Sequence, residues 1–353
     1  MRLTIVLESW GTGGTEQYVD ALYRTLKASQ PSTHISLILL DGVPPSLDWA
    51  DETKTLGISS RSERRIFANA IADTKSDICH LHLYTSMLRV AKMVRRQTAS
   101  RLVTTFHSPI SQWNFRHRLK FRLAVHKCDV VIGASDFTAN QLQRWRSDTI
   151  SAPPPITSDA TASAQRSTPP TSNFKVCGLG RLATEKSWET LIDAIAAVHS
   201  NRTVRLDLIG EGPLRAKLQS QINALGVSDR ITLRGRLEHS AALTAVATAD
   251  LFVLPSKFEG FGMAAVEAMM LGVPVITSDF PASHEFIKDG ITGHHFPIGD
   301  ADALARTIIW HMQNPTESLA MAEAGQRVAL IHYQPERIAK IHLDLYLDCM
   351  SIA

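Results

Sequence analysis

The stretch from Ser256 to Glu267, read as SKFEGFGMAAVE, constrains this chain more than any other part of its sequence. It follows an apolar run that predicts a buried strand, and it leads into a helical run that begins at Met263. Two carboxylates, Glu259 and Glu267, flank a Gly-Phe-Gly turn. The exposed N–H groups of a helix N-terminus favour anions such as phosphate. A neighbouring carboxylate accepts hydrogen bonds from sugar hydroxyls. The pattern therefore predicts a site for a ligand that carries both phosphate and sugar.

Short apolar strands alternate with helical periodicities along the whole chain, which is the order of parallel α/β architecture. At 353 residues the chain exceeds what one hydrophobic core usually fills, so we expect two doubly wound, Rossmann-like domains facing a cleft. A segment rich in Ser, Thr, Ala and Pro predicts a linker at 157–172, between a first domain at 1–156 and a second at 173–333. The predicted strands are Leu3–Leu7, His34–Leu40, Ile78–Leu83, Arg101–Phe106, Val130–Gly133, Lys175–Leu179, Arg205–Ile209, Arg230–Leu233, Leu251–Leu254 and Val273–Thr277.

Positive charge is concentrated in the first half of the chain. Residues 1–170 carry 21 Lys and Arg against 14 Asp and Glu, whereas the remaining residues carry 16 against 20. The basic residues cluster at 61–65, 89–101 and 116–127. Such clusters are either solvated helix faces or a surface that attracts anionic lipid headgroups or an anionic acceptor. No nucleic-acid-binding motif accompanies them, so nucleic acid is not an expected partner.

Two absences in the sequence narrow the class of protein. No stretch approaches about 18 consecutive apolar residues, so no membrane-spanning helix is expected. The cysteines form no C-x-x-C pair, which predicts buried free thiols rather than a metal or redox site. They are scattered at Cys79, Cys128, Cys177 and Cys349.

A glycine loop, formed by Gly11, Gly13 and Gly14, separates the first predicted strand from a helical run. It lacks the third glycine of the G-x-G-x-x-G fingerprint, which argues against a nicotinamide cofactor. Gly13 and Gly14 still allow the backbone to approach a ligand phosphate at the start of the helix. A plain strand-to-helix turn explains the same glycines equally well.

His107 directly follows the strand predicted at Arg101–Phe106. Open α/β sheets bind ligands at the carboxyl ends of their strands, so His107 is the histidine expected to contact a ligand. His80 and His82 point to one face of another strand, since a single residue separates them. No third metal ligand accompanies the pair, and we expect them to pack or to form hydrogen bonds behind the site.

The second domain opens with a strand and a glycine-containing loop that places Arg181 and Lys186 five positions apart. A guanidinium grips oxygen atoms in bidentate fashion and an ammonium adds a point charge, so the two suit a diphosphate. A surface loop with incidental charge is the alternative. It is disfavoured because this loop and the element carrying Glu259 and Glu267 occur in one domain.

Together these motifs resemble those of the retaining nucleotide-sugar glycosyltransferases of family 4, which have the GT-B fold. The resemblance covers nearly the whole chain and is strongest from Val176 to Pro297. The matching stretches are Gly13–Gly14, Gly180–Lys186, Leu208–Pro213, Pro255–Gly262, Gly272–Ile276 and Gly290–Gly293.

The resemblance implies a role for each matching residue. Arg181 and Lys186 would bind the donor diphosphate and stabilise the leaving nucleotide. Glu259 would bind hydroxyls of the donor sugar, Glu267 would accept from the ribose, and His107 would face the sugar and the acceptor. The implied catalytic residues are therefore His107, Glu259, Arg181 and Lys186. The implied donor-binding residues are Gly13, Gly14, Arg181, Lys186, Arg234, Gly260, Phe261, Gly262 and Glu267.

Several of these roles concern the backbone or the surroundings of the donor. Backbone N–H groups of Gly260 to Gly262 would touch the phosphate or the sugar, and the loop at Arg234 would meet the base. Gly14 would approach the phosphate across the cleft. A C-terminal helix within 334–353 would cross back onto the first domain.

The sequence departs from the family pattern in two places. Ser187 follows Lys186 where many members have glycine, and a Pro-rich run at 152–156 replaces an N-G-V-D-like run. No D-x-D element suited to Mg²⁺ is present, so we expect neither a metal ion nor a cofactor.

We therefore expect a retaining hexosyl- or N-acetylhexosaminyl-transferase that uses a nucleoside-diphosphate sugar and a glycan or lipid-linked acceptor, in envelope or exopolysaccharide synthesis. It would be cytoplasmic, with peripheral contact at the inner face of the cell membrane if the basic clusters bind anionic lipid. Three alternatives remain: a GT-B sugar-nucleotide epimerase, a non-catalytic sugar-nucleotide-binding protein and a dinucleotide-dependent oxidoreductase.

Overall fold

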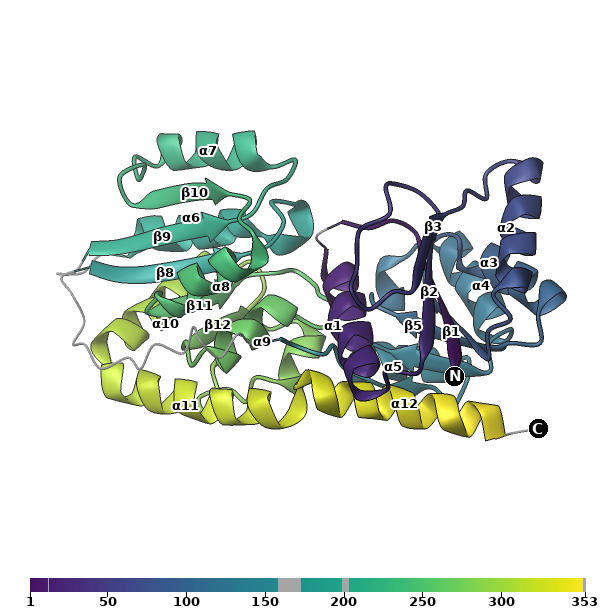
Figure 1. Cartoon of the computed structure of the whole chain (residues 1–353). Coiled ribbons are helices and arrows are strands. Elements are labelled where there is room, and N and C mark those ends of the chain that lie inside the picture. Colours follow the sequence, from purple (N-terminus) through teal and green to yellow (C-terminus); the bar gives the residue numbers. More distant parts are fainter. Residues whose placement is uncertain (12, 158–172, 199–202, 352–353) are drawn as a thin grey trace. The chain divides into compact units, whose positions relative to one another are not determined.

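The computed structural model describes the chain except residues 12, 158–172, 199–202 and 352–353 (Figure 1). The chain divides into two compact units. The N-terminal unit consists of Met1–Pro155 together with Tyr333–Ala353, and the C-terminal unit consists of Ile156–His332. Apart from its first residue, the linker expected at 157–172 lies outside the described residues.

The N-terminal unit contains a seven-stranded parallel sheet with the order β3-β2-β1-β4-β5-β6-β7. In β1, Leu3 is paired with Ile35 of β2 on one side and with Ile78 of β4 on the other. The strand order reverses between β1 and β4, so the carboxyl ends of these two strands mark the expected ligand-binding crevice. The strands are β1 (Arg2–Leu7), β2 (His34–Leu39), β3 (Glu52–Thr55), β4 (Ile78–His82), β5 (Arg101–Phe106), β6 (Val130–Gly133) and β7 (Ile150–Ser151).

Helices cover both faces of this sheet (Figure 1). Apolar residues of α2, α3 and α4 pack on one face, where Phe67, Val90 and Phe121 are buried. Helices α1 and α12 pack on the other face around Tyr23 and Tyr346. The C-terminal segment of the chain is therefore part of the core of the N-terminal unit. The helices are α1 (Gly14–Ser29), α2 (Arg61–Asp73), α3 (Met87–Gln97), α4 (Phe115–Val125), α5 (Asp136–Gln143) and α12 (Pro335–Ser351).

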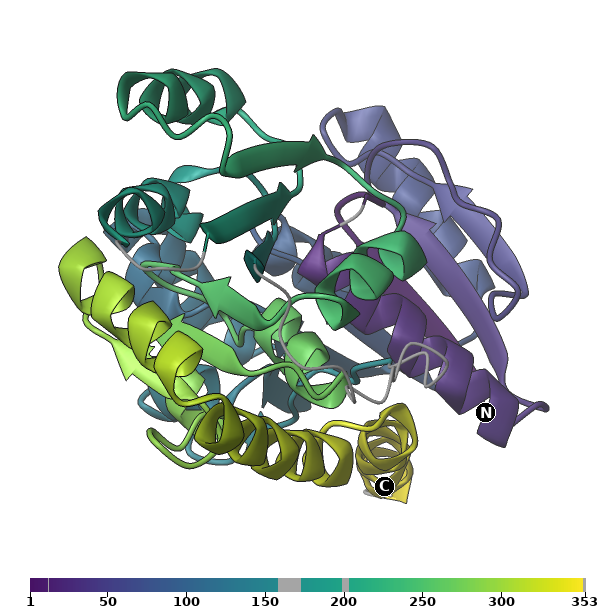
Figure 2. The ribbon, with the colours of Figure 1, turned by 90° about the vertical axis from the view of Figure 1, so that its left-hand side faces the viewer.

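The C-terminal unit repeats this architecture with a six-stranded parallel sheet in the order β10-β9-β8-β11-β12-β13. Helix α6 contacts α7 and α10, while α9 contacts α8 and α11, and helices flank the sheet in both views (Figures 1 and 2). The strands are β8 (Asn173–Leu179), β9 (Thr203–Ile209), β10 (Ile231–Gly235), β11 (Leu251–Leu254), β12 (Val275–Ser278) and β13 (His294–Phe296). The helices are α6 (Trp188–Ala197), α7 (Arg215–Ala224), α8 (His239–Ala247), α9 (Met263–Met270), α10 (Ala301–Gln313) and α11 (Pro315–His332).

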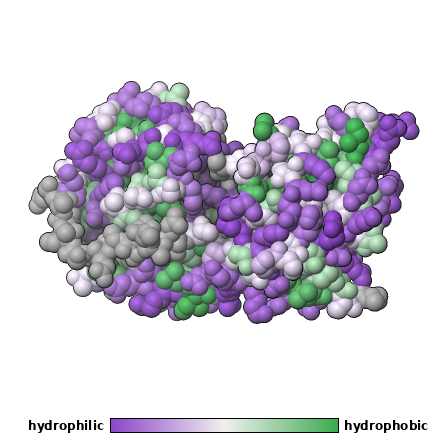
Figure 3. All heavy atoms as spheres, in the orientation of Figure 1, coloured by the Kyte–Doolittle hydropathy of each residue, from purple (hydrophilic) through white to green (hydrophobic). Residues whose placement is uncertain are grey.

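The face of the molecule in Figure 3 is mostly hydrophilic, with apolar side chains in small separate patches. All four cysteines are buried free thiols, which confirms that prediction. No helix in the described part of the chain combines the length and the apolar character needed to cross a bilayer.

Candidate functional site

The loops after β8 and β11 meet where the strand order of the C-terminal unit reverses. The first loop carries Arg181 and Lys186, and the second carries Glu259. The two loops are joined directly, because the backbone N–H of Lys257 donates to the carbonyl oxygen of Glu185 at 2.8 Å. Doubly wound sheets bind ligands at this place, the topological switch point.

Lys186 and Glu259 form the central ion pair of this site. The Nζ atom of Lys186 lies 2.5 Å from Oε1 of Glu259, and the two side chains are only 18% and 14% exposed. The hydroxyl of Ser256, at the end of β11, donates to the same Oε1 at 2.6 Å. Ser256 is fully buried, and its carbonyl oxygen accepts a hydrogen bond from the hydroxyl of Ser278. The carboxylate of Glu259 therefore has two polar partners, the ammonium of Lys186 in the loop after β8 and the hydroxyl of Ser256 just beyond β11.

Arg181 is the more exposed of the two predicted cations, since its side chain is 67% exposed, and it pairs with Glu185 four residues later. Its backbone is fixed, since the indole Nε1–H of Trp188 donates to the carbonyl oxygen of Arg181 at 2.9 Å. Burial raises the pKa of Glu185, but the hydrogen bond from Arg181, a backbone hydrogen bond and the charges of Arg181 and Lys186 together leave that pKa below its ordinary value. Glu185 was not among the predicted site residues, although its i, i+4 spacing from Arg181 is a readable signal.

The backbone conformation of Ser187 bears on one departure from the family pattern, the serine that stands where many members have glycine. It adopts a left-handed conformation, with φ 51° and ψ 39°, immediately before α6. Glycine adopts this conformation without strain, which gives a physical reason for glycine at this position in related sequences. Here Ser187 is buried, and its hydroxyl lies 3.1 Å from that of Thr190.

Glu267 lies on α9 and is only 5% exposed. Burial raises the pKa of its carboxyl, and the positive charges of His239 and Lys186 oppose that rise. His239, the first residue of α8, lies with Nε2 3.7 Å from Oε1 of Glu267. His239 was not among the predicted site residues, because nothing in the local sequence links it to a residue 28 positions away.

The Gly-Phe-Gly turn connects the two glutamates. Gly262 precedes α9 with φ 120°, and a Cβ atom there would lie 2.9 Å from the ring of Phe286. Phe261 is buried, and its ring centroid lies 5.4 Å from that of Phe286. The aromatic side chain thus anchors the turn, which leaves the backbone of Gly260 to Gly262 as the part suited to contact a ligand.

Arg234 lies apart from these groups, near the end of the edge strand β10. Its Nη1 is 4.0 Å from Oδ2 of Asp207, and that carboxylate also lies 3.6 Å from Nζ of Lys175. No ion pair within the described ranges joins Arg234 to Lys186, Glu259 or Glu267. Its predicted role at the base of the donor stays a prediction.

In the N-terminal unit, the glycine loop begins α1 at the switch point of the sheet. Gly13 precedes the helix, and a Cβ atom there would approach Oε2 of Glu16 to 2.7 Å. Gly14 is the first helical residue. The next residue, Thr15, shares a hydrogen bond with the hydroxyl of Tyr84, which follows β4. The loops after β1 and β4 are thereby joined.

His107 lies at the end of β5, beneath the first turns of α1. The ring of Tyr18 meets it edge-on at a centroid distance of 4.8 Å. Nε2 of His107 lies 2.9 Å from Nδ1 of His82, so one ring donates its N–H to the other. Burial, assisted by the charge of His342, lowers the pKa of His107 to about 3. His107 is therefore a neutral imidazole at ordinary pH.

Behind His107, histidines and tyrosines form a buried hydrogen-bond network in the N-terminal unit. The hydroxyl of Tyr23 lies 2.8 Å from Nδ1 of His80 and 3.1 Å from Nε2 of His82. Nδ1 of His80 also lies 2.7 Å from the hydroxyl of Tyr346, and its Nε2 lies 2.8 Å from that of Thr105. These contacts confirm the expectation that His80 and His82 form hydrogen bonds behind the site.

The C-terminal helix α12 supplies part of this network through His342 and Tyr346. Nδ1–H of His342 donates to the carbonyl oxygen of Ile338 at 2.9 Å. Its Nε2 must then accept from the hydroxyl of Tyr18, which lies 3.0 Å away. Burial lowers the pKa of His342 to about 4, although the hydrogen bond to Ile338 opposes this.

Among the described residues, one group of side chains has a geometry compatible with a metal ion. The potential ligand atoms of Asp279, His284 and His295 lie within 4.8 Å of one another. Asp279 and His284 are exposed and already contact each other at 2.7 Å, and Nε2 of His295 lies 2.9 Å from the hydroxyl of Ser283. The group was not predicted, and it includes no predicted site residue.

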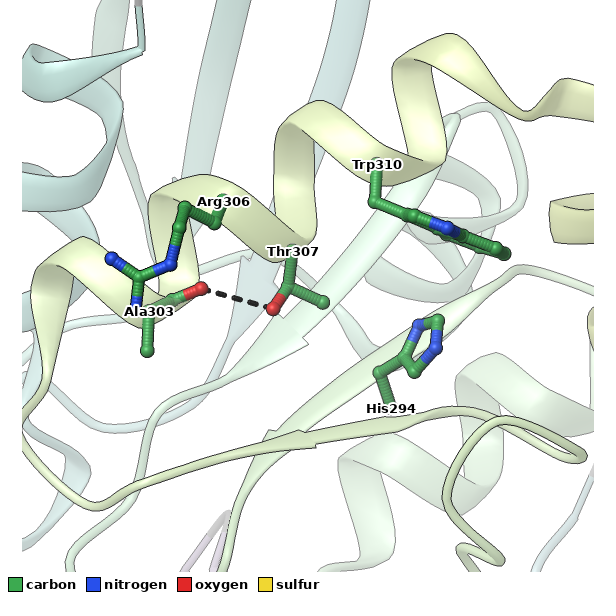
Figure 4. Close-up of a pocket in the computed structure, with 5 residues that line it drawn as sticks. All are labelled: His294, Ala303, Arg306, Thr307 and Trp310. Carbon is green, nitrogen blue, oxygen red and sulfur yellow. Dashed lines mark hydrogen bonds between the residues drawn. The ribbon is translucent and has the colours of Figure 1, made fainter.

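A pocket of about 350 Å³ lies elsewhere in the C-terminal unit, between α10 and β13 (Figure 4). The hydroxyl of Thr307 donates to the carbonyl oxygen of Ala303 on its helical side, and His294 faces Trp310 at a ring distance of 4.7 Å. Arg306 completes the lining. None of these residues was predicted to be functional.

Two family models match the chain. The model described as Glycosyltransferase Family 4 matches residues 12–154, and the model described as Glycosyl transferases group 1 matches residues 159–328. Together they cover most of both units.

Curated relatives match over part of their length. A phosphatidyl-myo-inositol mannosyltransferase of Mycobacterium leprae is 29% identical over 261 residues, which are 69% of this chain and 66% of that protein. A lipopolysaccharide core biosynthesis glycosyltransferase of Rhizobium meliloti is 30% identical over 48% of each chain. The matched regions span 38%, 48%, 66% and 43% of the first four curated relatives.

Among solved structures, the Anabaena protein HepE in complex with UDP and glucose superposes with a TM-score of 0.81. The match covers 99% of this chain and 100% of that one at 18% sequence identity. A likeness at this level of identity establishes the fold.

Proposed function

This chain belongs to the family 4 glycosyltransferases and has the GT-B fold, and from that premise we propose that it is a retaining glycosyltransferase. It moves a hexosyl or N-acetylhexosaminyl group from a nucleoside-diphosphate sugar to a glycan or lipid-linked acceptor. The observation that carries the proposal is the ion pair between Lys186 and Glu259, 2.5 Å apart and shortly before the N-terminus of α9. It places a cation for phosphate beside a carboxylate for sugar hydroxyls.

The charges of this site suit the departure of a nucleoside diphosphate. Cleavage of the glycosidic bond builds negative charge on the phosphate and positive charge on the sugar. Lys186, Arg181 and the helix N-terminus beyond Gly262 offset the negative charge. Each such preorganised contact contributes about 3 kcal/mol, or about a hundredfold in rate. Glu259, held by Ser256, accepts hydrogen bonds from the sugar and stabilises its positive charge.

The proposal also gives a role to Glu267 and to His107. Glu267 accepts hydrogen bonds from the ribose hydroxyls, and a ligand hydroxyl would add a polar partner to this buried carboxyl, whose pKa is raised by burial. His107, neutral and fixed by His82, contacts the sugar and the acceptor. A neutral imidazole offers one donor and one acceptor nitrogen without adding charge beside the developing cation.

The acceptor and the location are part of the same proposal. The relative of Mycobacterium leprae is named for transfer to phosphatidyl-myo-inositol, and that of Rhizobium meliloti for lipopolysaccharide core biosynthesis. We therefore assign the chain to envelope or exopolysaccharide synthesis, with a glycan or lipid-linked acceptor. The enzyme works in the cytoplasm, peripherally at the inner face of the cell membrane.

A panel of UDP-, GDP- and ADP-sugars tests this function, beginning with UDP-glucose because the Anabaena structure holds UDP and glucose. The assay measures released nucleoside diphosphate, and NMR of the product measures the anomeric configuration. Release with retention supports the proposal. An isomerised sugar nucleotide would identify an epimerase instead, and saturable binding without turnover would identify a sugar-nucleotide-binding protein.

A further inference from the structure

Helix α4 exposes an apolar stripe that no described residue of the N-terminal unit covers. Phe115, Leu119 and Leu123 are 78%, 47% and 48% exposed. They are spaced four residues apart, which places them within roughly 80° of the helix circumference. The opposite face packs into the core through Phe121 and Val125. The helix is therefore fixed by one apolar face and presents a second one outward.

Cations flank this stripe on both sides. At 100° per residue, Arg116 and Lys120 lie along one edge, and Arg118 and Arg122 along the other. All four are exposed, and none of them forms an ion pair with a residue that the structure describes. No Asp or Glu occurs between residues 115 and 127. Arg24 on α1, by contrast, contacts Asp20 and Asp48.

The neighbouring helix extends the positive surface. Helix α3 packs against α4 and also contains no acidic residue. Its exposed cations Arg89, Lys92 and Arg96 follow one face of the helix, at a spacing of three and four residues. Helix α3 adds charge but no further apolar stripe, so the contact centre is on α4.

The apolar stripe begins at the edge of the sheet that carries His107. Only eight positions separate His107 from Phe115. Between them, the indole of Trp113 stacks on Tyr84 at a centroid distance of 6.1 Å and meets Phe121 at 5.3 Å. The first turn of α4 is thus connected by packed rings to the loop after β4 at the switch point.

We propose that α4 docks the enzyme on an anionic lipid bilayer, with Phe115, Leu119 and Leu123 among the acyl chains near the headgroups. The flanking arginines and lysine contact lipid phosphates. An apolar stripe between two cationic rows matches the layered polarity of a membrane surface. A nucleic acid would use the cations and leave the stripe in water. The purpose of docking, access to a lipid-linked acceptor, rests on the proposed function, but the binding itself does not require turnover.

Co-sedimentation of the full chain with vesicles tests this inference. One set contains phosphatidylcholine alone, and the other contains phosphatidylcholine with about a quarter phosphatidylglycerol. At 0.05 M NaCl the protein should bind the anionic vesicles and not the neutral ones. Binding should weaken at 0.5 M NaCl, because the Debye length falls to a few ångström. No binding to anionic vesicles at low salt, or equal binding to both sets, overturns the proposal.

Two double variants separate the contributions of charge and apolar stripe. Lys120→Gln with Arg122→Gln should weaken binding about thirtyfold, since each cation near an anionic surface contributes about a factor of five. Leu119→Gln with Leu123→Gln should weaken it at least about tenfold and abolish the part that resists salt. The matched controls are Lys217→Gln with Arg327→Gln, and Leu225→Gln, all exposed in the C-terminal unit. They should bind like the wild type.

The outcomes also distinguish this inference from the proposed function. Release of nucleoside diphosphate with a soluble donor and no vesicles should be the same in the wild type and both variants, which also shows that the variants are folded. If the α4 variants bind vesicles as tightly as the wild type, the docking site is wrong while the enzyme assignment stands. Binding to a short oligonucleotide that equals binding to vesicles and survives the Leu119 and Leu123 changes would replace lipid with nucleic acid.

Discussion

The two units place their predicted site residues at the same point of the same kind of sheet, but one set forms an ion pair and the other is neutral. In the C-terminal unit, Lys186 and Glu259 form an ion pair beyond the ends of β8 and β11. In the N-terminal unit, His82 and His107 are neutral and meet at the end of β4 and β5. The difference lies in the partners of the two sets. The carboxylate of Glu259 is paired with a cation. Among the described residues, the imidazoles of His82 and His107 have no charged partner of that kind, and burial lowers their pKa values.

This contrast predicts different sensitivities for the two units. An ion pair is exchangeable, because under the proposed function an anionic ligand would take the place of Glu259 as the partner of Lys186. A hydrogen-bonded network of neutral groups offers no charge with which an anionic ligand could pair. We therefore expect its members to contribute to the stability of the fold rather than to the stabilisation of charge during the reaction. Substitutions in the C-terminal unit should therefore change turnover, and substitutions in the network should change stability.

The largest effect is expected at the phosphate cations. Lys186→Ala should lower kcat about a hundredfold, because removal of one preorganised donor to a developing anion costs about 3 kcal/mol. Arg181→Ala should lower it at least about tenfold, less than Lys186→Ala because the Arg181 side chain is more exposed. Steady-state kinetics with the identified donor measures both. Lys217→Ala on α7 is the control, and wild-type rates in both site variants would contradict the assignment.

Substitutions of the two glutamates should change different kinetic constants. Glu259→Gln should reduce kcat about thirtyfold, because a charged hydrogen bond to the reacting sugar contributes about 2 kcal/mol. Glu267→Gln should mainly raise KM, since the ribose is remote from the reaction. Determination of kcat and KM for each variant, with binding of nucleoside diphosphate by calorimetry, measures the split. The reverse pattern would mean that the two roles are exchanged.

Much of this organisation was readable from the sequence. The strands Arg101–Phe106, Val130–Gly133 and Leu251–Leu254 were predicted with the observed bounds, because they are short apolar runs buried on both faces. Edge strands β3, β7 and β13 were missed. They are only two to four residues long, and β3 reads ETKT, so they lack the run of apolar residues that predicts a buried strand.

The site was predicted by type of residue and not by contact. Local spacing indicated Arg181, Lys186, Glu259 and Glu267, since each lies beside a predicted strand end or helix start. The pairing of Lys186 with Glu259 depends on two loops 73 positions apart. The contact between His80 and Tyr346 spans 266 positions. A single sequence contains no signal for such pairs, because periodicity reports only on neighbours within one element.

The pH dependence of stability should reveal the neutral network. The folded-state pKa of His342 is about 4, below the ordinary value of 6.5, so the unfolded state binds more protons between these values. Its contribution is complete above pH 6.5 and is lost as pH falls toward 4. Between pH 7.5 and 5.5 that loss is about 1.4 kcal/mol.

Urea unfolding of the wild type and of His342→Gln at the two pH values measures this contribution. The glutamine amide still offers a donor and an acceptor, so the variant should lose less stability between pH 7.5 and 5.5 than the wild type. The exposed His126→Gln is the control and should follow the wild type. An identical pH dependence in His342→Gln would mean that His342 does not titrate as burial requires.

The smallest expected effect is that of removing one hydroxyl from the neutral network, and it distinguishes this network from the ion pairs of the C-terminal unit most directly. Tyr346→Phe keeps the ring contact with His80 and removes the hydroxyl that lies 2.7 Å from Nδ1 of that residue. Nδ1 retains the hydroxyl of Tyr23, so the cost should be about 1 kcal/mol, measured by urea unfolding at neutral pH. Tyr23→Phe should cost more, because its hydroxyl has three partners, His80, His82 and Tyr346.

Salt should leave this cost unchanged between 0.05 and 0.5 M NaCl, because no formal charge takes part in the network. The stabilising effect of the exposed pair between Arg181 and Glu185, measured with Glu185→Gln, should instead diminish as salt screens it. Equal salt dependence in Tyr346→Phe and Glu185→Gln would contradict the comparison, because the network would then contain a charged histidine. Both variants unfolding as the wild type does would show that neither contact contributes to stability.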